Sequence, residues 1–177
     1  SLGIKKLSVF RERNIAPNSK IPESVKFFSN IDKALQVKPE IVVIANPTSM
    51  HFPYAKKALE AGSHVYLEKP VSHNVDGVDR LLELQQNKNC VVQVGCQLRC
   101  HPQLVKIKDW INSGKLGDVH SVVADVGEYL PEWHPWEDYR KNYAAHRSMR
   151  GGPAIPMSKE IDMALLFILD ATSLQSL

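Results

Sequence analysis

The sequence predicts an α/β fold in which a doubly wound parallel sheet is followed by the start of a second α/β unit with an open sheet. Two observations predict the first part. Short apolar runs rich in β-branched residues alternate with helix-like patterns, and these runs end in polar turns. A third observation predicts the second part, because a pattern in which Val122, Ala124 and Val126 alternate with Ser121 and Asp125 begins after Gly117. We therefore expect domains at 1–101 and 102–177.

The first half of the chain supplies most of the expected sheet. Strands are predicted at 7–10, 25–28, 41–45 and 64–67, and each carries apolar or aromatic residues. Ser29 or Asn30 is placed to cap a helix over 31–37. A helix between the last two strands carries Phe52, Ala55 and Leu59 on one face and stops at Gly62.

The second half is predicted with longer elements. Ser72 or Asn74 would cap a helix that buries Val75, Val78, Leu82 and Leu81, and a strand follows at 90–95. Pro102 begins a helix that Gly114 ends. A long strand is expected over 119–129, then a structureless but aromatic stretch over 130–152. Ser158 would cap a final helix with Ile161, Leu165 and Ile168 on one side.

Composition excludes several classes of protein. The net charge of +3 is spread along the chain, so no basic stripe for nucleic acid is present. No apolar run is long enough for a membrane span, and the first residues do not resemble a signal peptide. Three cysteines without CxxC spacing indicate reduced thiols of a cytoplasmic protein, and no metal site is predicted.

Two strand ends are the first place to look for a ligand site. The run at 41–45 ends in Asn46 and Pro47, and the run at 64–67 ends in Glu68, Lys69 and Pro70. A β-α-β unit has a right-handed crossover, so both strands run parallel and both ends open on the same edge. Ligands bind at that edge in open α/β sheets.

These residues carry a resemblance to a known family. The segment Ile44-Ala45-Asn46-Pro47-Thr48 with His51, the segment 58–62 (ALEAG), and Glu68-Lys69-Pro70 resemble the Gfo/Idh/MocA family, and Gly151-Gly152 with Glu160-Ile161-Asp162 is similar to a second family landmark. The resemblance implies an NAD(P)-dependent oxidoreductase acting on a sugar, nucleotide sugar or cyclitol. It implies a Rossmann domain followed by an α/β domain, and a homo-oligomer formed through the C-terminal sheet.

The resemblance also implies roles for individual residues. Lys69, Glu68 and Lys159 would be catalytic. The cofactor, NAD or NADP, would be bound by Arg11, Arg13, Asn46, Pro47, Thr48, His51, Glu68, Lys69 and Gln97. The substrate would meet Lys69, Arg99, Trp136 and Tyr139. The bond before Pro70 would be cis, as is common in the family. Two arginines after the first predicted strand could hold a 2′-phosphate, which makes NADP plausible.

The chemistry of the residues agrees with these roles. Oxidation of a carbinol needs a proton acceptor, and the cofactor takes the hydride. A lysine held partly out of water gives up its proton more easily, which suits proton transfer near neutral pH. Plainer alternatives remain open: solvated side chains for Arg11 and Arg13, local hydrogen bonds at a helix start for His51, and packing on a sheet for the aromatic residues.

Two departures from the family pattern stand out. No GxGxxG can be made from the nine glycines, so the expected sheet is a partial Rossmann sheet without its central first strand, and we expect a chain truncated at both ends. The family's catalytic His is Lys159 here, and its Asp falls on Ile155 or Pro156. Lys159 either replaces the His as base or forms an ion pair or faces solvent. A non-catalytic relative that serves binding or assembly is therefore the competing hypothesis.

Overall fold

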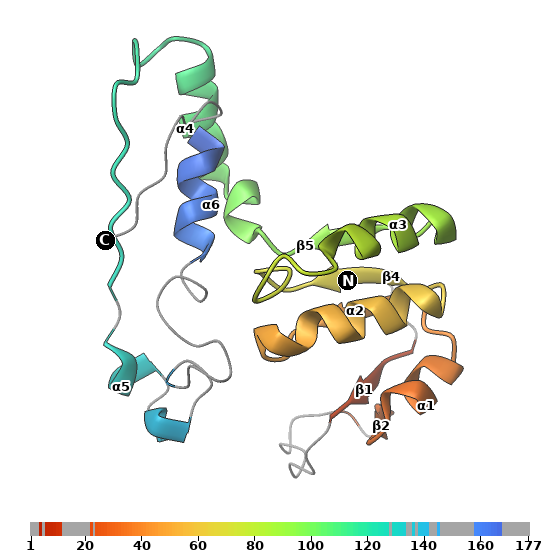
Figure 1. Ribbon diagram of the computed structural model, residues 1–177. Coiled ribbons are helices and arrows are strands. Elements are labelled where there is room, and N and C mark those ends of the chain that lie inside the picture. Colours follow the sequence, from red (N-terminus) through yellow and green to blue (C-terminus); the bar gives the residue numbers. More distant parts are fainter. Residues whose placement is uncertain are drawn as a thin grey trace.

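The computed structural model describes residues 4, 6–11, 22, 24–127, 129–133, 136, 138–141, 145 and 158–167. Parallel strands with flanking helices occupy the first part of the chain, and α4 and α6 lie side by side in the second part (Figure 1). The strands are β1 (Ser8–Phe10), β2 (Lys26–Phe28), β3 (Ile41–Ile44), β4 (His64–Leu67) and β5 (Val92–Val94). The α-helices are α1 (Ile31–Gln36), α2 (His51–Glu60), α3 (Val78–Lys88), α4 (Pro102–Asn112), α5 (Leu130–Trp133) and α6 (Ser158–Phe167). Three 3-10 turns complete the elements: η1 (Thr48–Met50), η2 (Gln97–Cys100) and η3 (Tyr139–Lys141).

The strands form two separate parallel sheets. β3, β4 and β5 are neighbours in that order, and β1 pairs with β2. No pairing joins β1 to β3 among the described residues. In a Rossmann sheet the strands corresponding to β1 and β3 flank the central first strand. The two sheets therefore match the predicted α/β fold with a partial Rossmann sheet that lacks this strand.

The core lies between the three-stranded sheet and two helices. Ala55, Ala58 and Leu59 of α2 are fully buried, and so is Leu67 of β4. Leu81 and Leu84 of α3 join the same cluster. Full burial of one leucine side chain stabilises a fold by about 1.5–3 kcal/mol. This packing holds the strand ends that carry the polar residues in a fixed place.

Two predicted helix ends are confirmed. The side chain of Asn30 accepts a hydrogen bond of 3.0 Å from the backbone N–H of Lys33, so Asn30 is the N-cap of α1. α2 ends at Glu60, and Gly62 follows with a φ of +82°. That left-handed conformation is easiest for glycine, which explains the stop.

The predicted start of α3 is wrong. The helix begins at Val78, and its N-cap is Gly77. Ser72 and Asn74 instead bond to each other in the preceding turn, with the Ser72 hydroxyl donating to Asn74 Oδ1 at 3.4 Å. The predicted buried face is also partly wrong, because Val75 is 86% exposed and Leu82 is 56% exposed. The helix turns Leu81 inward, as predicted, together with Leu84, which the predicted face did not include.

The second unit differs most from prediction. Residues 118–127 form no strand in the described part of the chain, although the alternating pattern predicted one over 119–129. A strand needs a ladder partner, and no described segment pairs with this one. Within the predicted structureless stretch, the short elements α5 and η3 form. Ser158 is the first residue of α6 and not its cap, as its Oγ is buried without a hydrogen-bond partner among the described atoms. The helix buries Leu166, while Ile161 and Leu165 are 39% and 38% exposed.

Two further kinds of feature are absent from the described residues. None of their helices has the length and apolar character needed to cross a membrane. They also hold no group of three His, Cys, Asp or Glu side chains that could hold a metal ion. The oligomerisation sheet expected after residue 102 likewise has no strand in the described ranges.

Candidate active-site cavity

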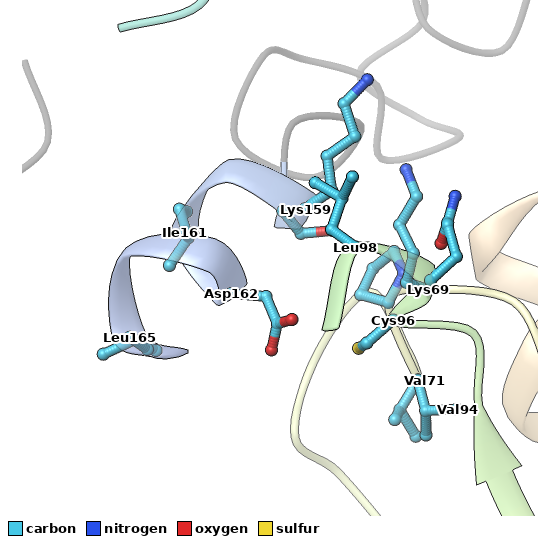
Figure 2. Close-up of a pocket in the computed structure, with 12 residues that line it drawn as sticks. Lys69, Val71, Val94, Cys96, Leu98, Lys159, Ile161, Asp162 and Leu165 are labelled. Carbon is cyan, nitrogen blue, oxygen red and sulfur yellow. The ribbon is translucent and has the colours of Figure 1, made fainter. Parts of the chain in front are cut away.

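A cavity of about 280 Å³ lies between the carboxyl ends of β4 and β5 and the helix α6 (Figure 2). Segments far apart in sequence line it: Lys69, Pro70, Val71, Val94, Cys96, Gln97, Leu98, Ser158, Lys159, Ile161, Asp162 and Leu165. The lining is mainly apolar, with a few polar groups placed among the apolar side chains. That composition is typical of small-molecule sites.

Lys69 is the second residue after β4 and enters the cavity from the sheet. The Lys69–Pro70 bond is cis, as the resemblance implied. Lys159 enters from the first turn of α6. The amino groups of the two lysines point toward the same side of the cavity, whereas Asp162 and Cys96 face each other across it (Figure 2). The fold thus brings together two lysines that are ninety residues apart in the sequence.

Glu68 lies beside the cavity, with its side chain folded back on the chain. The backbone N–H of Lys69 donates to Glu68 Oε2 at 3.3 Å. Gly95 leaves room for this arrangement, since a Cβ there would lie 3.2 Å from Glu68 Oε1 and 2.9 Å from the Tyr66 hydroxyl. Gly95 is therefore a packing requirement at the strand end that carries Glu68 and Lys69.

Arg99 and Asp162 form a bidentate ion pair at the cavity wall. Arg99 Nε donates to both carboxylate oxygens at 3.0 and 2.9 Å, and an Nη donates to one of them at 2.7 Å. The hydrogen bonds to Asp162 raise the pKa of Arg99 above its ordinary value, so the guanidinium stays charged. The pair joins η2, at the end of the sheet, to α6.

Cys96 sits at the floor of the cavity next to this pair. Burial, together with the negative charge of Asp162, raises the pKa of the Cys96 thiol, and Arg99 opposes the shift only in part. A raised pKa means that the thiol keeps its proton at neutral pH. Cys96 can then donate its S–H to the Asp162 carboxylate but is a poor nucleophile.

His51 and Asn46 define the neighbouring strand end. The ring nitrogens of His51 lie 2.7 Å from the Pro70 carbonyl oxygen and 2.8 Å from the Asn46 carbonyl oxygen. The side chain is 1% exposed. Both ring nitrogens are engaged by the backbone carbonyls of Pro70 and Asn46, so they do not contact a cofactor directly. The predicted direct contact is therefore replaced by a role in positioning that backbone.

The side chain of Asn46 offers the best test of whether a nicotinamide cofactor fits. Its Oδ1 is buried and has no hydrogen-bond partner in the described structure. A buried acceptor of this kind is costly unless a ligand satisfies it. It stands after β3 at the ligand edge of the sheet, so the residues fit the nicotinamide side of a dinucleotide. The sequence has no glycine-rich loop for the pyrophosphate.

Lys159 is paired within its own helix turn. Its Nζ lies 3.5 Å from Glu160 Oε1, which is the ion-pair alternative named for it from the sequence. The second oxygen of Glu160 is buried and has no partner among the described atoms. At the position of the family's His, this chain thus has Lys159, which forms an ion pair with Glu160 at the cavity wall.

Most of the other predicted site residues lie outside the cavity. Gln97 lines it, but Arg11 and Thr48 do not. Arg11 follows β1 and lies over the Phe27 ring at 5.9 Å. Trp136 is 77% exposed, and Tyr139 contacts Arg140 at 5.1 Å, so neither reaches the cavity. Arg13 falls outside the described residues, as do Gly151, Gly152, Ile155 and Pro156.

Sequence reasoning missed part of this site. The cysteine spacing indicates only that Cys96 is a reduced thiol, and the resemblance includes Asp162 only as part of a family landmark. Neither had a role in the cavity. The position of Cys96, two residues after β5, was a signal that it stands at the ligand edge. The pairing of Arg99 with Asp162 had no sequence signal, because it spans 63 residues.

Comparison with known proteins places the fold in a class. The sequence profile described as "Oxidoreductase family, NAD-binding Rossmann fold" (GFO_IDH_MocA) matches residues 8–96, which is half of the chain. The fold is that of the NAD-binding Rossmann oxidoreductases. Within that class, the chain belongs to the Gfo/Idh/MocA family.

Individual relatives agree with this placement. The putative oxidoreductase YteT of Bacillus subtilis is 33% identical over 128 residues, covering 72% of this chain and 29% of the relative. UDP-N-acetylglucosamine 3-dehydrogenase of Acidithiobacillus ferrooxidans is 35% identical over 77 residues, covering 44% of this chain and 24% of the relative. The structure of GenD2 from gentamicin A biosynthesis in complex with NAD superposes with a TM-score of 0.66 at 18% identity, covering 81% of this chain and 40% of GenD2. At that identity it supports the fold alone. The chain spans less than a third of the length of these two curated relatives.

Proposed function

We propose that this chain is part of an oxidoreductase that transfers a hydride between NAD or NADP and a carbon of a sugar, nucleotide sugar or cyclitol. One observation carries the proposal: Lys69, at the end of β4, opens into a cavity beside Asn46, whose buried acceptor is unsatisfied. The similarity to UDP-N-acetylglucosamine 3-dehydrogenase supports a sugar-like substrate. So does the mixture of apolar wall and polar groups in the cavity.

Each residue has a stated part in the proposed mechanism. Asn46 and Pro47 would hold the nicotinamide side of the cofactor, which accepts or donates the hydride when bound. Lys69 would bond the substrate hydroxyl and take its proton, with Glu68 beside it to orient the lysine. Gln97, which lines the cavity, would contact the cofactor there. Arg99 would contact substrate only at its edge, because Asp162 engages its donors. Trp136 and Tyr139 would meet only a part of the substrate that extends beyond the cavity.

The Lys69→Ala variant tests the proposal. We expect the hydride-transfer rate of the enzyme to fall by about 10²–10⁴-fold, because a positioned acid–base group contributes that much. Nicotinamide absorbance with a panel of sugars, nucleotide sugars and cyclitols measures the rate. Lys56→Ala is the matched control, since Lys56 is an exposed residue of α2 paired with Glu60 at 3.8 Å. Equal turnover in the Lys69 and Lys56 variants would remove Lys69 from the reaction.

Arg11 would decide between the two cofactors. It stands at the carboxyl end of β1, where a Rossmann domain reads the adenine ribose. We expect the Arg11→Ala change to weaken NADP binding while NAD binding stays the same, if a 2′-phosphate is held there. Titration of each cofactor by fluorescence measures both affinities. Loss of both affinities together would contradict a role confined to the 2′-phosphate.

A non-catalytic relative is the second candidate, and Lys159 favours it. The family's His is replaced by a lysine that is paired with Glu160 at 3.5 Å. If Lys159 acts as a base, Lys159→Ala lowers turnover and Lys159→His keeps or raises it. A protein that binds cofactor but turns over no member of the panel would favour the binding role. Light scattering of the protein tests the proposed homo-oligomer independently of activity.

A further inference from the structure

Both ring nitrogens of His51 lie within hydrogen-bond distance of backbone carbonyl oxygens. This side chain begins α2 and is 1% exposed. Its Nδ1 lies 2.7 Å from the Pro70 carbonyl oxygen, and its Nε2 lies 2.8 Å from the Asn46 carbonyl oxygen. Both distances are in the hydrogen-bond range.

Counting protons shows what these two contacts require. A carbonyl oxygen can only accept a hydrogen bond, and a neutral imidazole has one N–H and one lone pair. In the neutral form, one nitrogen would therefore aim its lone pair at a buried oxygen. Only the doubly protonated ring donates to both oxygens.

The two carbonyl oxygens belong to segments that flank the proposed cofactor and substrate. Asn46 follows β3, and Pro70 follows Lys69 at the end of β4. The nearest charged residues on these segments are Glu68 and Lys69, and no described ion pair includes His51. One ring thus links the strand end that would bind the nicotinamide to the strand end that carries Lys69.

We propose that His51 is a positioning residue whose imidazole carries a proton on both nitrogens and clamps the carboxyl ends of β3 and β4 together. The clamp sets the separation between Asn46 and Lys69. Its importance for turnover rests on the proposed function, whereas its protonation and its effect on the backbone do not.

His64 provides an internal control. Its Nδ1 accepts a hydrogen bond of 2.9 Å from the backbone N–H of Val91. This nitrogen must therefore be unprotonated, and His64 is neutral in the arrangement seen here. His51 begins α2 and His64 begins β4, and the two rings are expected in opposite protonation states, so a single spectrum compares them.

The first experiment is long-range ¹H–¹⁵N correlation of the histidine rings in ¹⁵N-labelled protein at neutral pH. We expect two protonated nitrogens for His51 and one protonated, one bare nitrogen for His64. A neutral tautomer pattern for His51 would overturn the proposal. The result does not depend on whether the protein is an active enzyme.

The second experiment compares His51→Gln with His64→Gln. The glutamine side chain has a single nitrogen, which cannot reach both the Pro70 and the Asn46 carbonyl oxygens as the two ring nitrogens do. His51→Gln therefore releases at least one strand end. We expect larger shifts of the backbone amide signals of Asn46 and Lys69 in His51→Gln than in His64→Gln. In turnover we expect kcat to fall by about 10–100-fold, with a smaller change in KM. Unshifted Lys69 signals would overturn the positioning role, whereas shifted signals without any wild-type turnover would sink the proposed function alone.

Discussion

At the scale of single residues, the cavity is built from groups that neutralise one another. Arg99 engages Asp162, Lys159 engages Glu160, and Cys96 keeps its proton beside Asp162. A thiol next to a carboxylate in a half-buried place is an unreactive group. The cavity therefore gains polar contacts for a ligand without gaining a strong nucleophile.

The Cys96 thiol yields a pH prediction. Its raised pKa means that the folded protein holds the proton more tightly than the unfolded chain does, so alkylation of Cys96 should require higher pH than alkylation of a free thiol. The same shift makes stability fall as pH rises through the thiol range, because the unfolded state releases its proton first. Mass spectrometry of iodoacetamide labelling in a Cys100→Ser background, with N-acetylcysteine as the reference, gives the rates. Alkylation of Cys96 at the same pH as N-acetylcysteine, or at a lower pH, would contradict the raised pKa of Cys96.

Asp162 links the thiol to the ion pair. In Asp162→Asn, two causes that raise the Cys96 pKa are lost, namely the negative charge and its hydrogen bond. We expect Cys96 to be alkylated faster at a given pH in this variant. We also expect a loss of about 1 kcal/mol in unfolding free energy, since Arg99 is 46% exposed and solvent screens the pair. The exposed pair of Arg80 and Glu83 offers the control, as Glu83→Gln should change neither quantity appreciably.

At the scale of elements, short turns decide where the helices point. Gly77 has a φ of +75° and supports the start of α3. A Cβ on it would lie 2.7 Å from Cζ of Phe52 in α2. This glycine therefore combines a left-handed backbone with close contact between the two helices that cover the sheet.

Gly77→Ala separates these two requirements when it is compared with Gly114→Ala. Gly114 has a φ of +68°, but nothing lies within 4 Å of a Cβ placed there. We expect Gly114→Ala to cost about 1–2 kcal/mol for the left-handed backbone alone. Gly77→Ala should cost more, because Phe52 must move as well. Equilibrium urea unfolding measures both, and equal costs would mean that Phe52 yields freely.

At the scale of the whole molecule, the open edge of β3 is the main consequence of the two-sheet arrangement. Among the described residues β3 pairs only with β4, whereas β4 is paired on both sides, with β3 and with β5. A strand with one paired edge leaves half of its backbone groups without ladder partners.

Hydrogen exchange measures this asymmetry. We expect the amides of β4 to exchange most slowly in the sheet, and β3 to contain amides that exchange much faster, because only one of its edges is paired. Mass-spectrometric or NMR exchange at residue resolution gives the rates. Uniform protection across all of 41–44 would mean that another strand, from this chain or a second copy, covers the edge.

Patterns in the sequence were enough to predict the α/β class, the parallel strands of the first half, a helix cap at Ser29 or Asn30, the helix end at Gly62 and the edge where Asn46 and Lys69 meet. Apolar runs, turn residues and crossover handedness are local properties, so a pattern reports them. Only the tertiary structure decided that Arg99 and Asp162 join, that Cys96 faces their carboxylate, and that His51 spans two strand ends. Those contacts cross 63 residues in one case and 19 in another, and no local pattern encodes them. The 119–129 strand failed for the same reason, since alternation supplies a face but a strand also needs a neighbour.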